Sequence, residues 1–266
     1  MSPLQIISGK SIKKLEEWSE YAPHGRDDHW QAGCSTYELA KRWLRASWKY
    51  SNGLPPEVEE VLASRSELKG LIALRAYAEM LTEVDECSSR TRQHDLVVIG
   101  EVNKQRVLMD IEGIGDERFD KSIAKKLKKK KDDPESTFPQ RVNRLAQAIF
   151  GLDAESISEL RYQLLFNVAA TLVRARLENA SMAVFLVHEF RKPEQKKKKL
   201  EANAQDLEEF IKLLLERNKV AAASQNINAP QFLMGPFAVR GTPANDANPI
   251  PSNIPLYIGK AMCELK

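Results

Sequence analysis

Two acidic residues, Asp95 and Glu112, stand at the outer ends of an apolar segment that predicts two strands joined by a turn. Residues 97–99 and 107–111 are mostly Val, Ile, Leu and Met, and the turn lies at 101–105. Such runs, bounded by turn residues, are typical of strands. A hairpin returns its far end to its near end, so we expect the two carboxylates to lie close together. Mg²⁺ prefers oxygen ligands and commonly takes one or two protein carboxylates, so the pair predicts a divalent metal site.

The elements that position this pair are predicted from hydrophobic spacing and capping signals. Ser35-Thr36-Tyr37-Glu38 reads as the capping box of a helix. In chain order we expect a helix at 35–48, strands within 72–84, at 95–100 and at 105–112, further helices, the longest at 156–179, a strand at 181–190, and a helix at 203–218. Two short edge strands are expected in the tail, within 231–239 and 254–262. This order predicts an α/β fold with a mixed central sheet flanked by helices, with one domain over 1–220 and an extension over 221–266 that packs on it.

Composition places the chain among ordinary globular proteins. It has 266 residues, 42% of them hydrophobic and 29% charged, with a net charge of +3. The three cysteines, at positions 34, 87 and 263, form no CxxC pair, which argues against a zinc site or a disulfide framework and favours a reduced, cytoplasmic compartment. The first residues do not read as a signal peptide, and no apolar run reaches the length of a membrane span.

Several segments, spread over nearly the whole chain, resemble one known group of proteins. They are WQAGCSTYELAKRW, HDLVVIG, IEGIGDERF, LRYQLLF, AVFLVHEF and IPLYIGKA. Their order resembles the core of the PD-(D/E)XK, or restriction-endonuclease-like, nuclease superfamily. They also resemble a bacterial family that we place in that superfamily. The resemblance implies a restriction-endonuclease-like core and hydrolysis of DNA phosphodiester bonds, with defence against foreign DNA as an analogy.

The resemblance also implies roles for particular residues. Asp95 and Glu112 would hold Mg²⁺ or Mn²⁺, with the backbone carbonyl of Gly113 as a third oxygen. Glu38 would be the additional acid found in many members, although its capping role alone explains it. Gln163 would position a water or the motif lysine from the helix behind the sheet. A metal held there would activate water and neutralise charge on the scissile phosphate.

One residue departs from the pattern of the superfamily. The motif lysine should stand at position 114, where this chain has Ile114. Two interpretations follow. The lysine has moved, with Lys121, Lys125 or Lys104 as its replacement, or the site is inactive and the scaffold binds nucleic acid or regulates without cleaving it.

Basic and aromatic side chains offer candidate contacts to nucleic acid. The run at 121–131, with Lys125, Lys126, Lys128 and Lys129, could track a phosphate backbone, and it could equally be a solvated block of charge. Trp30, Trp43 and Trp48 could stack on bases, although Trp43 has the spacing of a core residue. DNA is therefore the expected partner, with a homodimer and a protein-interaction role for the apolar tail left open.

Overall fold

The computed structural model describes residues 4–22, 30–85, 91–115, 117–131, 133, 135–192, 197–220, 229–243 and 245–265. The helices are α1 (Leu15–Ser19), α2 (Ser35–Lys49), α3 (Pro56–Ala63), α4 (Ile123–Lys130), α5 (Phe138–Phe150), α6 (Tyr162–Leu177) and α7 (Lys197–Arg217). No helix within these ranges is both long and apolar enough to cross a membrane.

A mixed sheet forms the centre of the fold, as predicted. Its strands are β1 (Gln5–Ser8), β2 (Lys10–Ser11), β3 (Ile72–Ala78), β6 (Leu96–Val102), β7 (Gln105–Ile114), β8 (Met182–Arg191), β9 (Phe232–Phe237) and β10 (Leu256–Glu264). Their order across the sheet is β2-β1-β3-β6-β7-β8-β10-β9. A two-stranded ribbon, β4 (Leu81–Thr82) with β5 (Arg92–Gln93), lies beside it. The α/β class with flanking helices is therefore confirmed.

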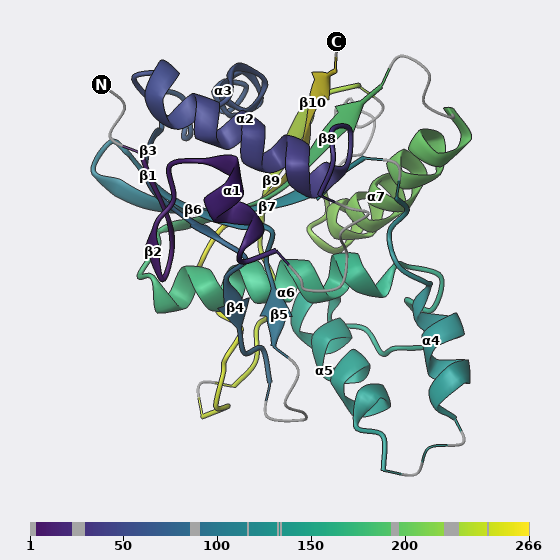
Figure 1. The fold of residues 1–266 in the computed structure, drawn as a ribbon. Coiled ribbons are helices and arrows are strands. Elements are labelled where there is room, and N and C mark those ends of the chain that lie inside the picture. Colours follow the sequence, from purple (N-terminus) through teal and green to yellow (C-terminus); the bar gives the residue numbers. More distant parts are fainter. Residues whose placement is uncertain are drawn as a thin grey trace.

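Helices cover both faces of this sheet (Figure 1). Trp18 of α1, Trp43 of α2 and Val58 of α3 share a hydrophobic cluster with Val98 on one face. The preceding residue, Val97, belongs to the opposite cluster, which contains the core residues of α5, α6 and α7. This alternation is the two-residue period of a strand, and it explains why the run at 97–99 is apolar throughout.

The β6–β7 hairpin is where the predicted strand pair lies. Its register pairs Leu96 with Ile111 and Val102 with Gln105. The turn residues Asn103 and Lys104 both have positive φ, at 49° and 63°. Two successive residues with positive φ form the tight turn whose twist matches that of antiparallel strands, so the turn itself sets the register.

Four expectations differ from the structure. The strand expected within 72–84 is divided into β3 and β4, with Glu79 between them at a positive φ of 54°. The helix expected from 156 begins at Tyr162, because the segment before it instead meets α4, where Ile123 N donates to Leu160 O at 2.9 Å. The helix expected from 203 begins at Lys197. The second tail strand is not at an edge: β10 lies between β8 and β9.

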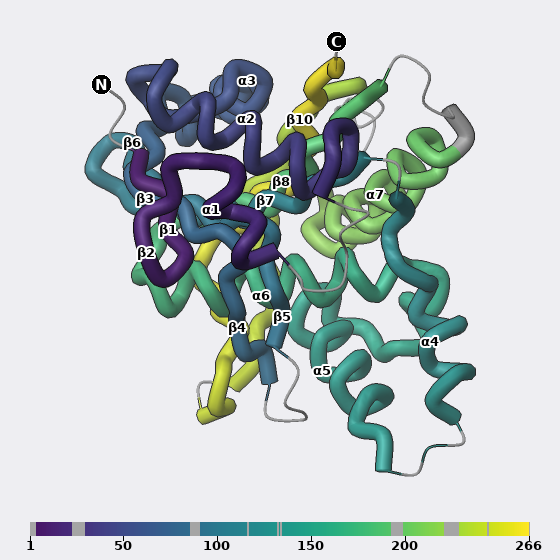
Figure 2. Tube along the Cα trace, in the orientation of Figure 1, coloured from purple at the N-terminus to yellow at the C-terminus, as the bar shows by residue number. Residues whose placement is uncertain are grey.

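Segments far apart in the chain therefore meet in the sheet. β1 pairs in parallel with β3, and β10 pairs in parallel with β8 over nine residue pairs. Figure 2 shows this course, with the purple N-terminal segment and the yellow C-terminal segment both running beside the central strands. The region after residue 220 thus contributes an interior strand to the sheet.

Candidate functional site

The site is built where the β6–β7 hairpin opens. Continuing the register by one residue places Asp95 opposite Glu112. Asp95 Oδ2 accepts a hydrogen bond of 2.9 Å from the backbone N of Gly113, which joins the two strand ends. The sequence prediction that the two carboxylates lie close together is therefore met by the structure.

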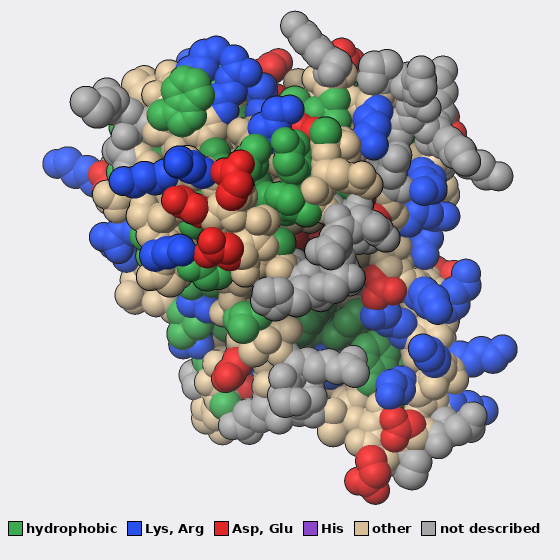
Figure 3. All heavy atoms as spheres, in the orientation of Figure 1, with side chains coloured by type: hydrophobic (Ala, Val, Ile, Leu, Met, Phe, Trp, Pro, Cys, Tyr) green, Lys and Arg blue, Asp and Glu red, His purple; other side chains and the backbone are tan. Residues whose placement is uncertain are grey.

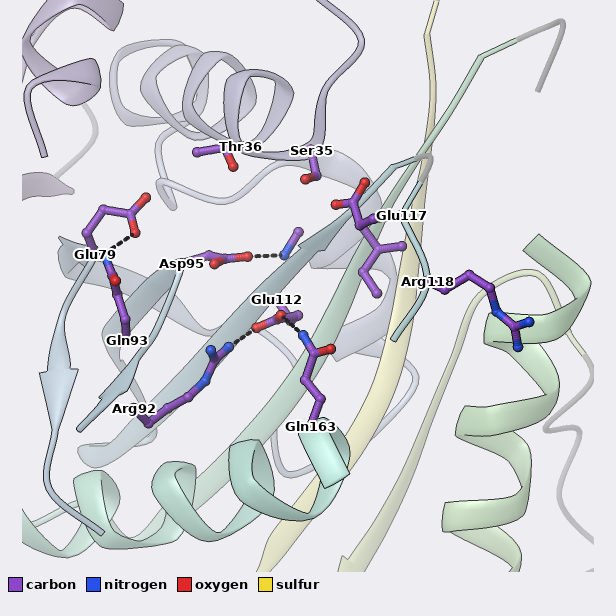
Figure 4. Close-up of a pocket in the computed structure, with 12 residues that line it drawn as sticks. Ser35, Thr36, Glu79, Arg92, Gln93, Asp95, Glu112, Glu117, Arg118 and Gln163 are labelled. Carbon is purple, nitrogen blue, oxygen red and sulfur yellow. Dashed lines mark hydrogen bonds and ion pairs between the residues drawn. The ribbon is translucent and has the colours of Figure 1, made fainter. Parts of the chain in front are cut away.

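Glu112 is buried and held by three side chains from two other elements. Gln163 Nε2 donates to Oε1 at 2.6 Å, and Asn167 Nδ2 donates to Oε2 at 3.1 Å. These two residues are four apart on α6 and so lie on one face of that helix. The guanidinium of Arg92, on β5, forms an ion pair with Oε2 from the other side. Figure 4 shows Arg92 and Gln163 converging on Glu112.

A second buried network surrounds Asp110, which is two residues before Glu112 on β7 and therefore on the same face of the strand. Asp110 Oδ2 accepts a hydrogen bond of 2.7 Å from Thr171 Oγ1 of α6 and lies 2.9 Å from His94 Nδ1. The other ring nitrogen of His94 is 2.9 Å from Thr82 Oγ1 of β4. These contacts connect α6, the hairpin and the β4–β5 ribbon, and thereby support the elements that carry Gln163 and Arg92.

A cavity of about 430 Å³ opens above the two carboxylates. Its wall includes Ser35 and Thr36 from the first turn of α2, and Glu79 from between β3 and β4. Glu117 and Arg118 complete the side nearest α7, and Arg118 points away toward Asp206 at 3.4 Å (Figure 4). The lining is mostly polar and acidic, with Arg92 as the cation that faces Glu112.

Burial and mutual repulsion raise the pKa of each carboxyl at the bottom of this cavity. Loss of solvent raises the pKa of Asp95 well above its usual range, and the charges of Glu112 and Glu79 raise it further. Burial also raises the pKa of Glu112, although Arg92 opposes the increase. The pKa of Glu79 is raised to about 7, mainly by burial. The guanidinium of Arg92 alone therefore does not neutralise the three carboxylates when all of them are ionised.

The raised pKa of Glu79 predicts a stability that depends on pH. Folding raises this pKa from 4.5 to about 7, so its contribution to stability is complete below 4.5 and is lost as the pH rises through 7. We expect Glu79→Gln, which resembles the protonated acid, to match the wild-type melting temperature at about pH 4 and exceed it by about 5 °C at about pH 8. Thermal unfolding in the presence of a chelator measures both values. Equal melting temperatures at pH 8 would contradict the assigned pKa.

The residues predicted from the sequence fall into two groups. Asp95, Glu112, Gly113 and Gln163 all line the cavity. Glu38 does not line it. α2 begins one residue earlier than the capping box implies, with Cys34 as its N-cap, so Glu38 reaches back to accept a hydrogen bond of 2.8 Å from Gly33 N. It lies in a second cavity, of about 400 Å³, that also contains Lys41.

None of the three replacement lysines lines the cavity either. Lys104 is in the turn at the far end of the hairpin. Lys121 has an exposed side chain, because the chain leaves β7 toward the start of α6, where Lys121 O accepts from Tyr162 N at 3.4 Å. Lys125 is exposed on α4.

Arg92 is the cation that sequence reasoning missed. Ile114 lines the cavity but is 2% exposed and belongs to the hydrophobic cluster beside α6, so an apolar side chain stands where the superfamily pattern has its lysine. Arg92 approaches Glu112 from β5 instead. The residues around Arg92 in the sequence are polar and do not show the alternation of a strand. Its position three residues before Asp95 is the sequence feature that could have indicated a place in the site.

The predicted phosphate contacts of α4 are partly engaged within the protein. The Lys126 ammonium pairs with Asp120 and lies 4.6 Å from the centre of the Tyr162 ring. Lys125, Lys128 and Lys129 are exposed, and Figure 3 shows basic side chains along the flank formed by α4. These three residues remain candidates for contact with a polyanion.

The fold and the site together define an α/β protein with a buried acidic cavity at the open end of its central hairpin. A family model described as a domain of unknown function, DUF6946, matches residues 11–263, so the chain belongs to that family. No curated protein and no solved structure matches the chain.

The donor set at this site suits a hard divalent cation. Within the described residues, no three acidic, His or Cys side chains come together as a complete metal-binding group. Mg²⁺ keeps several of its waters, however, and needs only one or two carboxylates from the protein. Asp95 and Glu112 supply two, and a cation bound between them would oppose the burial and repulsion that raise the pKa of both carboxyls.

Proposed function

We propose that this protein is a metal-dependent nuclease that hydrolyses DNA phosphodiester bonds at the cavity above Asp95 and Glu112. The observation that carries the proposal is the meeting of Asp95, Glu112 and Gln163 in one cavity, from two strands and a helix. The sequence alone predicts all three as residues of one site. A cytoplasmic location and a role against foreign DNA are parts of this proposal.

Each residue has a role that follows from its contacts. Asp95 and Glu112 would hold Mg²⁺ or Mn²⁺, with the Gly113 carbonyl as a further oxygen. The bound cation would activate water and neutralise charge on the scissile phosphate. Gln163 and Asn167 fix the orientation of the Glu112 carboxylate through their hydrogen bonds. Arg92 supplies positive charge beside Glu112, as the motif lysine does in the superfamily that the chain resembles.

The contact between Arg92 and Glu112 also favours a second candidate function. A guanidinium cannot act as a base, because it stays protonated at any working pH. If Arg92 serves only to neutralise Glu112, then the scaffold binds nucleic acid or regulates without cleavage. Among the described residues no lysine lines the cavity, which favours the same interpretation.

Incubation of the purified chain with supercoiled plasmid separates these functions. We expect relaxed and linear products with Mg²⁺ or Mn²⁺ and none with a chelator. Cleavage of neither plasmid nor single-stranded DNA with either metal would reject the nuclease proposal. Retention of DNA in the same samples would then support the second candidate.

Arg92 should be required for cleavage but not for metal binding. We expect Arg92→Ala to reduce nicking by about 10²-fold, because a positioned cation beside the reacting phosphate is lost. Arg92→Lys should retain much of the activity. Isothermal titration with Mg²⁺ should show affinity at least equal to that of the wild type, since the internal cation that competes for Glu112 has been removed.

Arg118→Ala is the matched control for this comparison. Arg118 lines the same cavity but pairs with Asp206, outside the acidic group. It should nick plasmid at close to the wild-type rate. If both arginine variants lose activity equally, the effect is general electrostatics and Arg92 has no special role.

A further inference from the structure

We propose that the outer face of α2 binds single-stranded nucleic acid and leads it to the acidic cavity. The face is a strip of four residues, Lys41, Arg45, Trp48 and Lys49, which we call the α2 strip. The inference rests on the proposed function only in taking nucleic acid as the partner. It adds the surface that binds the strand and the single-stranded form of the ligand.

Helix geometry places these four side chains together. Lys41 and Arg45, and likewise Arg45 and Lys49, are four residues apart, and Arg45 and Trp48 are three apart, so the four side chains lie along one side of the helix. The opposite side carries the residues that α2 buries against the sheet, including Leu39, Trp43 and Ala46. The strip therefore faces away from the core, and Figure 3 shows basic side chains gathered over α2.

Trp48 is the most exposed large apolar side chain in the described residues. Its exposed fraction is 70%, whereas Trp18 and Trp43 are fully buried. An exposed tryptophan offers a flat surface on which an unpaired base can stack. Basic residues beside it can pair with the adjoining phosphates. Bases inside a duplex are already stacked on one another, so this surface favours a single strand.

Three of the four strip residues are basic, and one of them, Lys41, has its ammonium 3.6 Å from the carboxylate of Glu38. Arg45 is exposed and forms no ion pair with an acidic side chain within the described residues. Lys41 and Arg45, and likewise Arg45 and Lys49, are like charges four residues apart, which costs an isolated helix a few tenths of a kcal/mol per pair. A row of phosphates would remove that repulsion.

The first turn of α2 lies beside the acidic cavity, at the N-terminal end of the helix that carries the strip. Ser35 and Thr36, in the first turn of α2, line the cavity above Asp95 and Glu112. From Ser35 to Lys49 the helix extends about 20 Å at 1.5 Å per residue. A strand that stacks on Trp48 and follows Arg45 and Lys41 therefore runs along the helix toward its N-terminal end, where the cavity lies.

Binding of a fluorescein-labelled oligothymidine of about 12 nucleotides tests the inference. A chelator is present, so cleavage does not enter the measurement. We expect Trp48→Ala to weaken binding about tenfold and Trp48→Phe, which keeps a stacking ring, to weaken it much less. Arg45→Glu should also weaken binding and reduce the salt dependence, the slope of log K against log salt, by about 0.7. Duplex of the same length should bind more weakly and should not respond to Trp48→Ala.

Lys104→Glu is the control, since it reverses a basic charge in the hairpin turn at the far end of the strands. It should bind within twofold of the wild type. Because the four strip residues lie on the helix surface, all variants should keep the wild-type melting temperature. Oligothymidine binding that is unchanged by Trp48→Ala and Arg45→Glu overturns the inference. Equal, Trp48-dependent binding of polyglutamate would instead identify an acidic protein partner and would also overturn it.

The two proposals fail in different ways. If the strip binds the oligonucleotide but no plasmid is cleaved under any condition, the nuclease proposal is wrong and the strip remains. If cleavage depends on Glu112 but Trp48→Ala leaves single-strand binding unchanged, the nuclease proposal stands and the proposal for the α2 strip is wrong. A Glu112→Gln protein should bind the oligonucleotide as tightly as the wild type when chelator is present.

Discussion

Glu112→Gln is expected to reduce metal-dependent nicking of plasmid by roughly 10³-fold or more. Glutamine keeps the shape of the side chain and can accept the hydrogen bond from Gln163, but it lacks the negative charge that holds a divalent cation. Asp95→Asn should have a similar effect for the same reason. Isothermal titration should show weakened Mg²⁺ binding in both proteins. A retained cooperative thermal transition in both then separates the loss of metal from a loss of fold.

Glu38→Gln provides a control with a buried glutamate of the same type. Glu38 is 5% exposed, as Glu112 is, but it lies in the second cavity and bonds to Gly33 N. Its activity should stay within about twofold of the wild type. Nicking by Glu112→Gln at the wild-type rate would mean that the activity comes from a contaminant or from another site.

Arg141→Met is expected to cause the largest loss of stability, about 3–5 kcal/mol. The guanidinium of Arg141, on α5, makes two bonds to Asp85, of 2.6 Å and 2.9 Å, and both side chains are almost fully buried. Methionine leaves the Asp85 carboxylate buried without its cation. The melting temperature should fall by about 10 °C in thermal unfolding.

The double variant Asp85→Asn with Arg141→Met tests the cause of that loss. Removing both charges leaves no uncompensated carboxylate, so the double variant should be more stable than Arg141→Met alone. If the two proteins melt at the same temperature, the loss comes from packing. One contact of that kind is with Phe166, whose ring centre lies 5.7 Å from the guanidinium carbon.

Local pattern was sufficient to predict the hairpin and its acidic pair. β6 and β7 are adjacent in the chain, and the turn at Asn103 and Lys104 sets their register within a few residues. Once that register exists, Asp95 and Glu112 must stand opposite each other. The alternation of helices and strands likewise predicted the α/β class, because each amphipathic element needs a partner layer.

Contacts between distant segments could not be predicted in this way. Arg92 reaches Glu112 because the short β5 strand pairs with β4, and neither strand is long enough to show a period. Glu79 lines the cavity at a point where the backbone has a positive φ. A glutamate in the sequence does not predict a positive φ. β10 was expected at an edge, and only pairing with β8 on one side and β9 on the other makes it interior.

The sequence by itself determined which two carboxylates face each other, because short-range antiparallel pairing follows from the chain's own turn. The tertiary structure decided which cation accompanies them. Position 114 is an isoleucine that belongs to the hydrophobic cluster. The positive charge beside Glu112 comes from Arg92 on β5. The tertiary structure also separated the tryptophans, since the packing of α2 buries Trp43 and leaves Trp48 on the surface.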